Sequence, residues 1–343
     1  MNGGCTHSGP QGARARARRR PPLPSGASIL PLSHGPTPQY SEEDVMRRAV
    51  LFLVFVLLLP TLALAHGDKT PKGPNWGIVL AAFGSVRPEA RAALDNVRAA
   101  MEDAFPGVPV RMGYSSRMVR GQLKVPSPLT VMSQLADEGR TDIVVVPLYV
   151  TAGDEYLDLL AQVRVLHGLT HAKVNKPPFT RVVLCDPALG STAHGDARAM
   201  ARTARALKAD ADAARAAGAA LVYAGHGNPR RPAWEMAAFQ SVLRKTSPGL
   251  VVAVGSLDAT PGLEDVIKSL KAAKARKVLL YPLLFVSGAH VDDDLCGAGK
   301  DTWKNALEAA GFSVECLARG LGESPDYAAM LVERARAAMG SAR

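Results

Sequence analysis

The segment Ile143-Val144-Val145-Val146-Pro147-Leu148 recurs later in the chain as Val278-Leu279-Leu280-Tyr281-Pro282-Leu283. Both runs are apolar throughout, which is typical of parallel strands that helices cover on both faces. The offset that places Ile143 on Val278 also aligns Gly153 with Gly288 after the two runs. These coincidences indicate that the chain contains two copies of one α/β unit.

Matches outside the two runs extend the duplication. Val131 falls on Val266 at the same offset, and Gly84 falls on Gly227 at a slightly larger one. In both copies, short apolar runs alternate with amphipathic stretches. The pattern predicts strands at 77–82, 108–113, 142–148, 181–185, 219–224, 250–254, 277–283 and 312–316. It predicts helices at 88–104, 128–138, from about 155, 232–245, 261–274, from about 291, and 325–339.

We therefore expect an α/β fold made of two similar, doubly wound, parallel-sheet domains of the Rossmann-like type. The N-terminal domain is predicted at 76–216 and the C-terminal domain at 217–340. Ligands of such sheets bind beyond the carboxyl ends of the strands, so the residues just after each strand are the candidates for a site. We expect the active site in the cleft between the two domains.

Composition narrows the class of protein. The 343 residues are 47% hydrophobic and 21% charged, which indicates a folded globular chain. Residues 1–65 hold seven Arg against three acids, so the net charge of +10 leaves a modest +6 for the rest of the chain. There is no dense basic block beyond the N-terminal tail, so we expect no nucleic-acid partner. An anionic small molecule fits better.

The four cysteines, Cys5, Cys185, Cys296 and Cys316, contain no C-x-x-C pair. This spacing argues against a cysteine zinc site and against a redox motif. Whether Cys296 and Cys316 pair with each other depends on their separation in space, which the sequence leaves open.

The N-terminal region has the features of an export signal. Residues 1–45 are rich in Pro, Gly, Ser and Arg, and we interpret them as disordered or as an over-extended gene prediction before Met46. Residues 46–65 have a basic start, an apolar stretch and an A-x-A cleavage site ending at Ala65. We expect cleavage after Ala65, a linker at 66–75, a periplasmic location and no stable membrane span in the mature chain.

Two alternatives to this interpretation remain open. The apolar stretch is at the short limit for crossing a bilayer, so an uncleaved anchor is the first of them. Arg47-Arg48 also allows a twin-arginine signal in place of the ordinary secretory route.

Polar side chains follow the equivalent strands of the two copies. His226 stands between Gly225 and Gly227 after one predicted strand, and His290 follows another. At the offset that places Ile143 on Val278, Glu155 falls on His290. If the two domains face each other, these three side chains converge. Two imidazoles and a carboxylate suit a divalent transition metal such as Co, Fe, Ni or Zn better than Ca or Mg.

Each of these residues also has a simpler interpretation. A single His226 is more typical of a histidine at a helix entry that bonds the backbone, and it is the combination with His290 and Glu155 that favours a metal site. The acidic run Asp292–Asp294 fits the first turn of a helix, where the helix dipole favours negative charge, as well as it fits support of a metal ligand.

Gly225-His226-Gly227 after a strand, followed by Pro282-Leu283-Leu284-Phe285-Val286-Ser287-Gly288-Ala289-His290, resembles the class II tetrapyrrole chelatases. The resemblance covers residues 75–340, and the two-domain anaerobic sirohydrochlorin cobaltochelatases, including periplasmic members, are the most similar. It implies a lyase that inserts Co²⁺, or Fe²⁺, into sirohydrochlorin without ATP in tetrapyrrole, cobalamin or haem biosynthesis. It also implies that His226 and His290 bind the metal and that Glu155 is the active-site glutamate.

The residue types suit this chemistry. Metal insertion removes two pyrrole N–H protons, so the site needs groups that bind metal and are basic near neutral pH. An ordinary histidine, with a pKa of about 6.5, does both. We expect His226 and His290 to hold the metal and accept protons, and Glu155 to supply charge compensation or a proton path. The cleft walls are expected to bend the macrocycle toward the metal.

Sirohydrochlorin-type tetrapyrroles are anionic, so cationic and hydroxyl side chains are expected at the mouth of the cleft. The candidates are Ser85, Arg87, Tyr114, Ser115 and Arg230. Arg117, Arg120, Lys124 and Arg231 are further basic candidates, and Ser116 is a further hydroxyl one.

A protein of another class remains an alternative, because an exported biosynthetic enzyme is unusual. A periplasmic metal- or haem-binding transport protein on the same scaffold is expected to use spare imidazoles, and His167 or His171 is the candidate haem ligand. The chain lacks the G-x-S-x-G motif of hydrolases and the G-x-G-x-x-G motif of dinucleotide-binding proteins. A sugar-binding protein fits less well at 5% aromatic residues. We also expect a homo-oligomer.

Overall fold

A computed structural model describes Glu43, Met46 and residues 75–170 and 177–340. The predicted extension at 1–45, the signal peptide at 46–65 and the linker at 66–75 therefore lie almost wholly outside the described residues. Within the described part of the chain, no helix combines the length and the apolar character that crossing a membrane needs.

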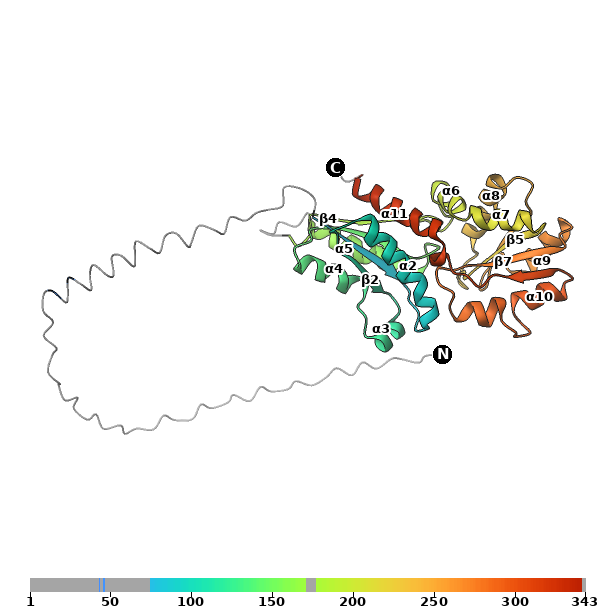
Figure 1. The fold of residues 1–343 in the computed structure, drawn as a ribbon, viewed down its shortest axis with the longest axis horizontal. Helices are drawn as coiled ribbons and strands as arrows, with labels where there is room; N and C mark the ends of the chain where they lie inside the picture. The colour runs from blue at the N-terminus through green and yellow to red at the C-terminus, as the bar shows by residue number, and fades with distance from the viewer. Residues whose placement is uncertain (1–42, 44–45, 47–74, 171–176, 341–343) are drawn as a thin grey trace, which may run out of the picture. The chain divides into compact units, whose positions relative to one another are not determined.

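The first half of the described chain forms one parallel sheet with helices on both faces (Figure 1). Its strands lie side by side in the order β2-β1-β3-β4. The elements are β1 (Trp76–Ala82), α2 (Pro88–Ala104), β2 (Val110–Tyr114), α3 (Arg117–Leu123), α4 (Pro128–Asp137), β3 (Asp142–Pro147), α5 (Asp154–Thr170), β4 (Arg181–Leu184), α6 (Ala197–Ala206) and α7 (Lys208–Ala216).

The second half repeats this arrangement, with strand order β6-β5-β7-β8. Its elements are β5 (Ala220–Gly225), α8 (Trp234–Thr246), β6 (Val252–Ser256), α9 (Leu263–Ala272), β7 (Lys277–Leu283), the π-helix η2 (Val291–Cys296), α10 (Trp303–Ala309), β8 (Ser313–Cys316), the 3₁₀ turn η3 (Leu321–Glu323) and α11 (Pro325–Gly340). The predicted α/β class with two doubly wound parallel sheets is confirmed.

Strand register confirms the internal duplication residue by residue. Ala81 of β1 pairs with Pro147 of β3, and Ala224 of β5 pairs with Pro282 of β7. The two sequence offsets align Ala81 with Ala224 and Pro147 with Pro282, so equivalent residues make equivalent pairs. Gly84 and Gly227, which follow the equivalent strands, both have positive φ angles, of +94° and +84°.

Several predicted boundaries needed correction. The stretch predicted as one helix from about residue 291 is divided into η2 and α10, because the chain turns tightly at Gly297, where a Cβ would lie 1.9 Å from the carbonyl oxygen of Asp292. The sequence pattern did not predict α3, α6 or α7. Helix α2, in contrast, begins at Pro88 and ends at Ala104 as predicted, with proline in the first turn, where its missing N–H loses no hydrogen bond.

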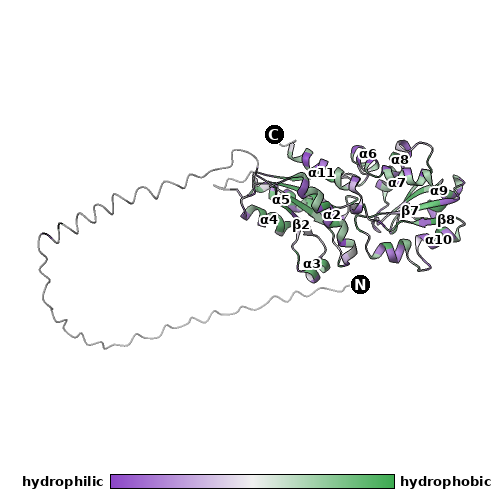
Figure 2. Ribbon diagram, viewed as in Figure 1, coloured by the Kyte–Doolittle hydropathy of each residue, from purple (hydrophilic) through white to green (hydrophobic). Residues whose placement is uncertain are grey.

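The two sheets share a hydrophobic core. One cluster of buried residues includes Leu80 and Val146 of the first sheet and Leu221 and Leu279 of the second. The apolar strands run through the interior of both halves (Figure 2). Separate clusters, one containing Val131 and one containing Val266, fill the outer faces of the two sheets.

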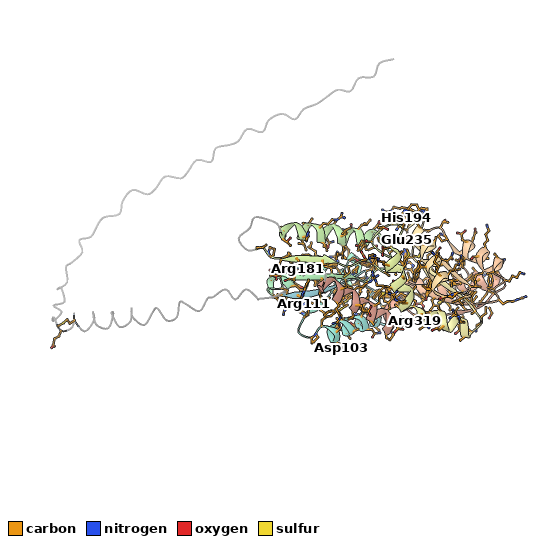
Figure 3. The ribbon with its side chains drawn as sticks, turned by 90° about the horizontal axis from the view of Figure 1, so that it is seen from above. Asp103, Arg111, Arg181, His194, Glu235 and Arg319 are labelled. Carbon is orange, nitrogen blue, oxygen red and sulfur yellow. A yellow bond between two sulfur atoms is a disulfide. The ribbon has the colours of Figure 1, made fainter. Side chains whose placement is uncertain are left out.

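Helices cross between the halves. Helix α11, at the end of the chain, packs against α2 and β3, and α6 packs against α8. His194, in the loop after β4, stacks on Trp234 at the start of α8 with ring centroids 4.8 Å apart, and Figure 3 labels His194 beside Glu235. The predicted domain boundary between 216 and 217 separates the two sheets, but it does not separate two independent cores.

A substitution in α11 tests the shared core. Leu331 is fully buried in it, and we expect Leu331→Ala to lower the free energy of unfolding by about 2–5 kcal/mol, as removal of a buried leucine side chain does. Both sheets should still unfold in one transition, measured by circular dichroism during chemical denaturation. Leu129→Ala on α4, where the leucine is 42% exposed, is the matched control and should change stability little. Two separate transitions in the parent protein would contradict a shared core.

Candidate functional site

The end of β5 holds the first imidazole of the site in a fixed place. The carbonyl oxygen of His226 accepts hydrogen bonds from Oγ of Ser256 and from the N–H of Asp258, both at 3.0 Å. Gly227 follows with a φ of +84°, and a Cβ at Gly227 would lie 1.8 Å from Oγ of Ser256. Because the ends of β5 and β6 approach each other so closely, only glycine fits after the histidine.

The second imidazole is carried by a short π-helix. His290 is the N-cap residue of η2, where Val291 and Leu295 are fully buried. Cys296, the last residue of η2, forms a disulfide with Cys316 at the end of β8. The sequence left open whether these two cysteines pair with each other, and the structure shows that they do. Two buried apolar side chains and a covalent bond thus anchor the segment that presents His290.

The structure brings the two predicted imidazoles together. The ring centroids of His226 and His290 are 4.7 Å apart, and the ring planes are nearly perpendicular at 88°. The two side chains are 48% and 54% exposed, so solutes can reach them. Rings this close can each place one nitrogen on a single metal ion at the bond length of about 2 Å that imidazole ligands take.

Each imidazole also contacts a carboxylate. Nδ1 of His226 lies 3.2 Å from Oδ2 of Asp258, and Nδ1 of His290 lies 2.6 Å from Oδ2 of Asp294. From the sequence we considered Asp294 only as part of the acidic run, and we did not identify Asp258. A search for polar residues just after each strand could have identified Asp258, because it lies two positions after the last residue of β6.

Ion pairs connect the strand ends of the two sheets. Nη1 of Arg87, after β1, lies 2.5 Å from Oδ2 of Asp292 in η2. Nη2 of Arg230, after β5, lies 3.2 Å from Oδ2 of Asp154 at the start of α5. Residues at the carboxyl-end edges of the two sheets are therefore joined by ion pairs.

Glu155 lies on the first-half edge, next to Asp154 and exposed in the first turn of α5. Burial raises the pKa of nearby Tyr149 to about 12, and the carboxylate of Glu155 acts in the same direction. No three His, Cys, Asp or Glu side chains in residues 75–170 and 177–340 form a group that could hold a metal ion. Glu155 thus lies at the carboxyl-end edge of the first sheet. It does not form a three-residue metal site with His226 and His290, which was the expectation from the sequence.

Four of the five predicted anion-binding side chains, those of Arg87, Arg230, Ser85 and Ser115, have partners within the protein. Arg87 and Arg230 are paired with aspartates of the other half, as described above. Oγ of Ser85 accepts a hydrogen bond from the N–H of Arg87 at 3.2 Å, and the N–H of Ser115 donates to the carbonyl oxygen of Ala82 at 2.8 Å. Tyr114 is partly buried against the end of β1, and burial raises its pKa. Ser85 and Ser115 shape the loops after β1 and β2 in this structure.

The transport alternative named His167 and His171 as candidate haem ligands. His167 lies near the end of α5, and His171 lies outside the described residues. Two cavities, of about 420 and 370 Å³, lie elsewhere: one lies between α7 and the segment with Tyr281 and Arg319, and the other lies at the opposite ends of the strands near Gly218 and Lys277.

Residues 76–340, which contain both sheets and both imidazoles, match the model of the family described as cobalt chelatase (CbiK). The chain belongs to this cobalt chelatase family. The sirohydrochlorin cobaltochelatase CbiKC of Nitratidesulfovibrio vulgaris is 31% identical to this chelatase over 273 residues, which cover 77% of this chain and 90% of that protein. The sirohydrochlorin cobaltochelatase of Salmonella typhimurium is 28% identical over 223 residues, which cover 65% of this chain and 78% of that protein.

A solved structure shares the fold of this chelatase. The sirohydrochlorin chelatase SirB from Bacillus subtilis subspecies spizizenii, solved in complex with cobalt, superposes with a TM-score of 0.53 at 14% identity. The superposition covers 78% of this chain and 96% of that one. At this identity the likeness concerns the arrangement of the sheets and helices.

Substitution of Gly227 tests the close approach that places His226. Gly227→Ala adds a Cβ that collides with Ser256 at a positive φ angle, so we expect a loss of stability of about 2–4 kcal/mol, or a displaced His226. Gly218→Ala is the matched control, because Gly218 also has a positive φ, of +59°, but has open space where the Cβ would go. Thermal unfolding of both variants measures the difference, and equal losses would show that the contact with Ser256 is unimportant.

Proposed function

We propose that this chelatase inserts Co²⁺ into sirohydrochlorin without ATP. The observation that carries the proposal is the pair of imidazoles 4.7 Å apart at the strand-end edge of a cobalt chelatase family member. The residues alone allow Fe²⁺ as well, and the two relatives named for cobalt favour Co²⁺.

His226 and His290 hold the metal in this mechanism. Both are accessible, and both leave one ring nitrogen away from the carboxylate that contacts Nδ1. When the metal passes into the ring, two pyrrole protons leave the macrocycle, and a freed imidazole nitrogen is a suitable acceptor for a proton near neutral pH. Charge is conserved, since one divalent cation replaces two protons in the ring.

The first-half edge contributes the other wall of the site. Phe83 follows β1 where His226 follows β5, and it is 49% exposed, so it offers an apolar surface to a flat ring. Glu155 stands on the same edge and supplies negative charge opposite the metal. Glu155 can bind the metal during its transfer to the ring only if the metal or the ring reaches from one sheet edge to the other.

The ion pairs at the mouth can exchange partners when an anionic substrate arrives. The Arg230 and Asp154 side chains are 80% and 54% exposed, and those of Arg87 and Asp292 are 35% and 64% exposed. Exposed pairs of this kind stabilise a protein by only about 0–1 kcal/mol, so a substrate carboxylate can replace the aspartate. Arg87 and Arg230 thus retain the substrate-binding role expected from the sequence.

Replacement of either imidazole tests the proposal. We expect His226→Ala and His290→Ala to lower the rate of anaerobic Co²⁺ insertion into sirohydrochlorin by more than about 100-fold, beyond the effect typical of residues that only support a metal ligand. The macrocycle absorbance measures insertion, and circular dichroism checks the fold. His194→Ala, which removes an exposed imidazole elsewhere, is the control.

The same assay separates the enzyme from the transport alternative. A carrier would bind Co²⁺ or tetrapyrrole stoichiometrically and release no metallated product. Insertion by His226→Ala at the parent rate would rule out the proposed site.

We further propose that the mature chain works in the periplasm after cleavage following Ala65. The Cys296–Cys316 disulfide supports this location, because disulfides persist in oxidising compartments and are rare in the cytosol. Closing a segment of 20 residues stabilises a fold by about 3 kcal/mol in the chain-entropy account.

Mass spectrometry of the exported protein tests the location. We expect an N-terminus at His66 and one alkylated cysteine, the buried Cys185, when the protein is denatured without reduction. Cys296→Ser combined with Cys316→Ser should lower the free energy of unfolding by about 3 kcal/mol. Cys185→Ala is the control for loss of a thiol outside the disulfide. Alkylation of Cys296 and Cys316 without reduction would contradict the proposal.

A further inference from the structure

We infer that Asp258 and Asp294 are positioning residues of this site, each of which fixes one imidazole with its Nε2 free to bind metal. The inference rests on the proposed function, since it concerns the same two histidines. It assigns a role to two carboxylates at different places in the chain, one after β6 and one within η2.

The contacts of His226 determine which ring nitrogen carries the hydrogen. Nδ1 lies 3.2 Å from the carbonyl oxygen of Gly227 and 3.2 Å from Oδ2 of Asp258. The carbonyl oxygen of Gly227 can only accept the hydrogen bond, so Nδ1 is the donor, and the carboxylate of Asp258 beside it favours the same N–H. In the neutral ring the lone pair is then on Nε2, which is the atom left for a metal ion.

The position of Asp258 is itself fixed by the same strand ends. Its N–H donates to the carbonyl oxygen of His226 at 3.0 Å, and the N–H of Leu257 donates to the carbonyl oxygen of Gly225 at 2.8 Å. The main chain that carries the carboxylate is thus bound to the main chain that carries the imidazole. The contact is built into the pairing of β5 with β6 and does not depend on a freely moving side chain alone.

His290 reaches the same state by a different route. Its Nδ1 lies 2.6 Å from Oδ2 of Asp294, four residues further along η2. Burial of Val291 and Leu295 and the disulfide at Cys296 hold this turn in place. Here too the partner of Nδ1 is an acceptor, which leaves Nε2 with its lone pair.

The internal duplication provides a comparison within one chain. The first half has Phe83 in place of His226 and Glu155 in place of His290. The register of β2 and β6 places Ser116 at the position of Asp258, and the offset that aligns Glu155 with His290 places Leu159 at the position of Asp294. The first half therefore has neither the imidazoles nor these two carboxylates at the equivalent positions.

Other acidic residues nearby do not take this role. Asp292 is bound to Arg87 of the first half at 2.5 Å. Asp293 is exposed and lies between the two. A negative first turn of a helix would be served by any of the three, whereas only Asp294 contacts the ring.

A carboxylate on the second nitrogen of a metal-binding histidine orients the ring and makes it a stronger ligand, and its removal typically weakens metal binding or activity about 10–100-fold. Both aspartate side chains are 44% exposed, so their contribution to folding should be small. A variant that lacks either aspartate should therefore bind the metal weakly and remain stably folded.

The test uses Co²⁺ alone, without tetrapyrrole, and follows the visible absorbance of bound Co²⁺. We expect Asp258→Ala and Asp294→Ala to weaken Co²⁺ binding about 10–100-fold and to change the absorbance spectrum, with unchanged thermal unfolding. In the insertion assay, KM for Co²⁺ should rise more than kcat falls, because the metal is bound before transfer. Asp258→Asn and Asp294→Asn retain an acceptor oxygen and should restore most of the affinity. Asp293→Ala, which removes the same charge from the same turn, is the control.

The outcomes separate this inference from the proposed function. If His226→Ala loses Co²⁺ binding while both Asp→Ala variants bind within twofold of the parent, the positioning role is wrong and the metal site stands. An equal loss of Co²⁺ affinity in Asp293→Ala would show that the effect comes from net charge alone, and it would also overturn the inference. If His226→Ala binds Co²⁺ like the parent, the proposed metal site itself fails.

Discussion

The parallel pairing of β5 with β7 decides where the chemistry of this chelatase is located. Gly225, the last residue of β5, pairs with Leu283, the last residue of β7, so both strands end at one edge. Main-chain bonds continue the alignment beyond β7, because Leu284 and Phe285 accept hydrogen bonds from the N–H groups of Leu321 and Gly322 at 2.9 and 3.0 Å. The two imidazole centroids near this edge are 4.7 Å apart.

The two halves have the same fold and different chemistry. The second half presents two imidazoles and the carboxylates that contact them, while the equivalent positions of the first half hold Phe83 and Glu155. In the proposed function, the nitrogen-rich edge suits the metal ion, and the apolar surface and countercharge of the other edge suit a flat ring. The proposal thus assigns the two roles to equivalent edges that differ by a few residues at the strand ends.

The sequence predicted what depends on burial and missed what depends on surface contacts. Runs such as Val144–Val146 are fully buried, and a strand covered on both faces must be apolar along its whole length. The eight strands could therefore be predicted from the sequence. Helices α6 and α7 each separate a buried face from a charged face, but the buried faces consist mainly of alanine. A search for large apolar side chains at helical spacing therefore missed them.

The same distinction applies to the site. His226 and His290 could be found because each follows a strand, and their convergence follows from sheet topology. The pairing of Arg87 with Asp292 and of Arg230 with Asp154 joins residues far apart in sequence and follows no local pattern. The division of the segment after His290 into a π-helix and α10 arises from the turn at Gly297 and from the disulfide, neither of which apolar periodicity records.

The shared core limits how a large substrate can enter. Helix α11 belongs to the end of the chain and yet packs on α2 and β3, so parting the two sheets as rigid bodies would expose Tyr327 and Leu331, which are 1% and 0% exposed. Full burial of such side chains is worth roughly 1.5–3 kcal/mol each, whereas each exposed ion pair at the mouth is worth about 0–1 kcal/mol. Entry through the mouth, by exchange of aspartate for substrate carboxylate at Arg87 and Arg230, therefore requires less free energy than separation of the halves. The ring would then approach His226 and His290 from the side on which they are already exposed.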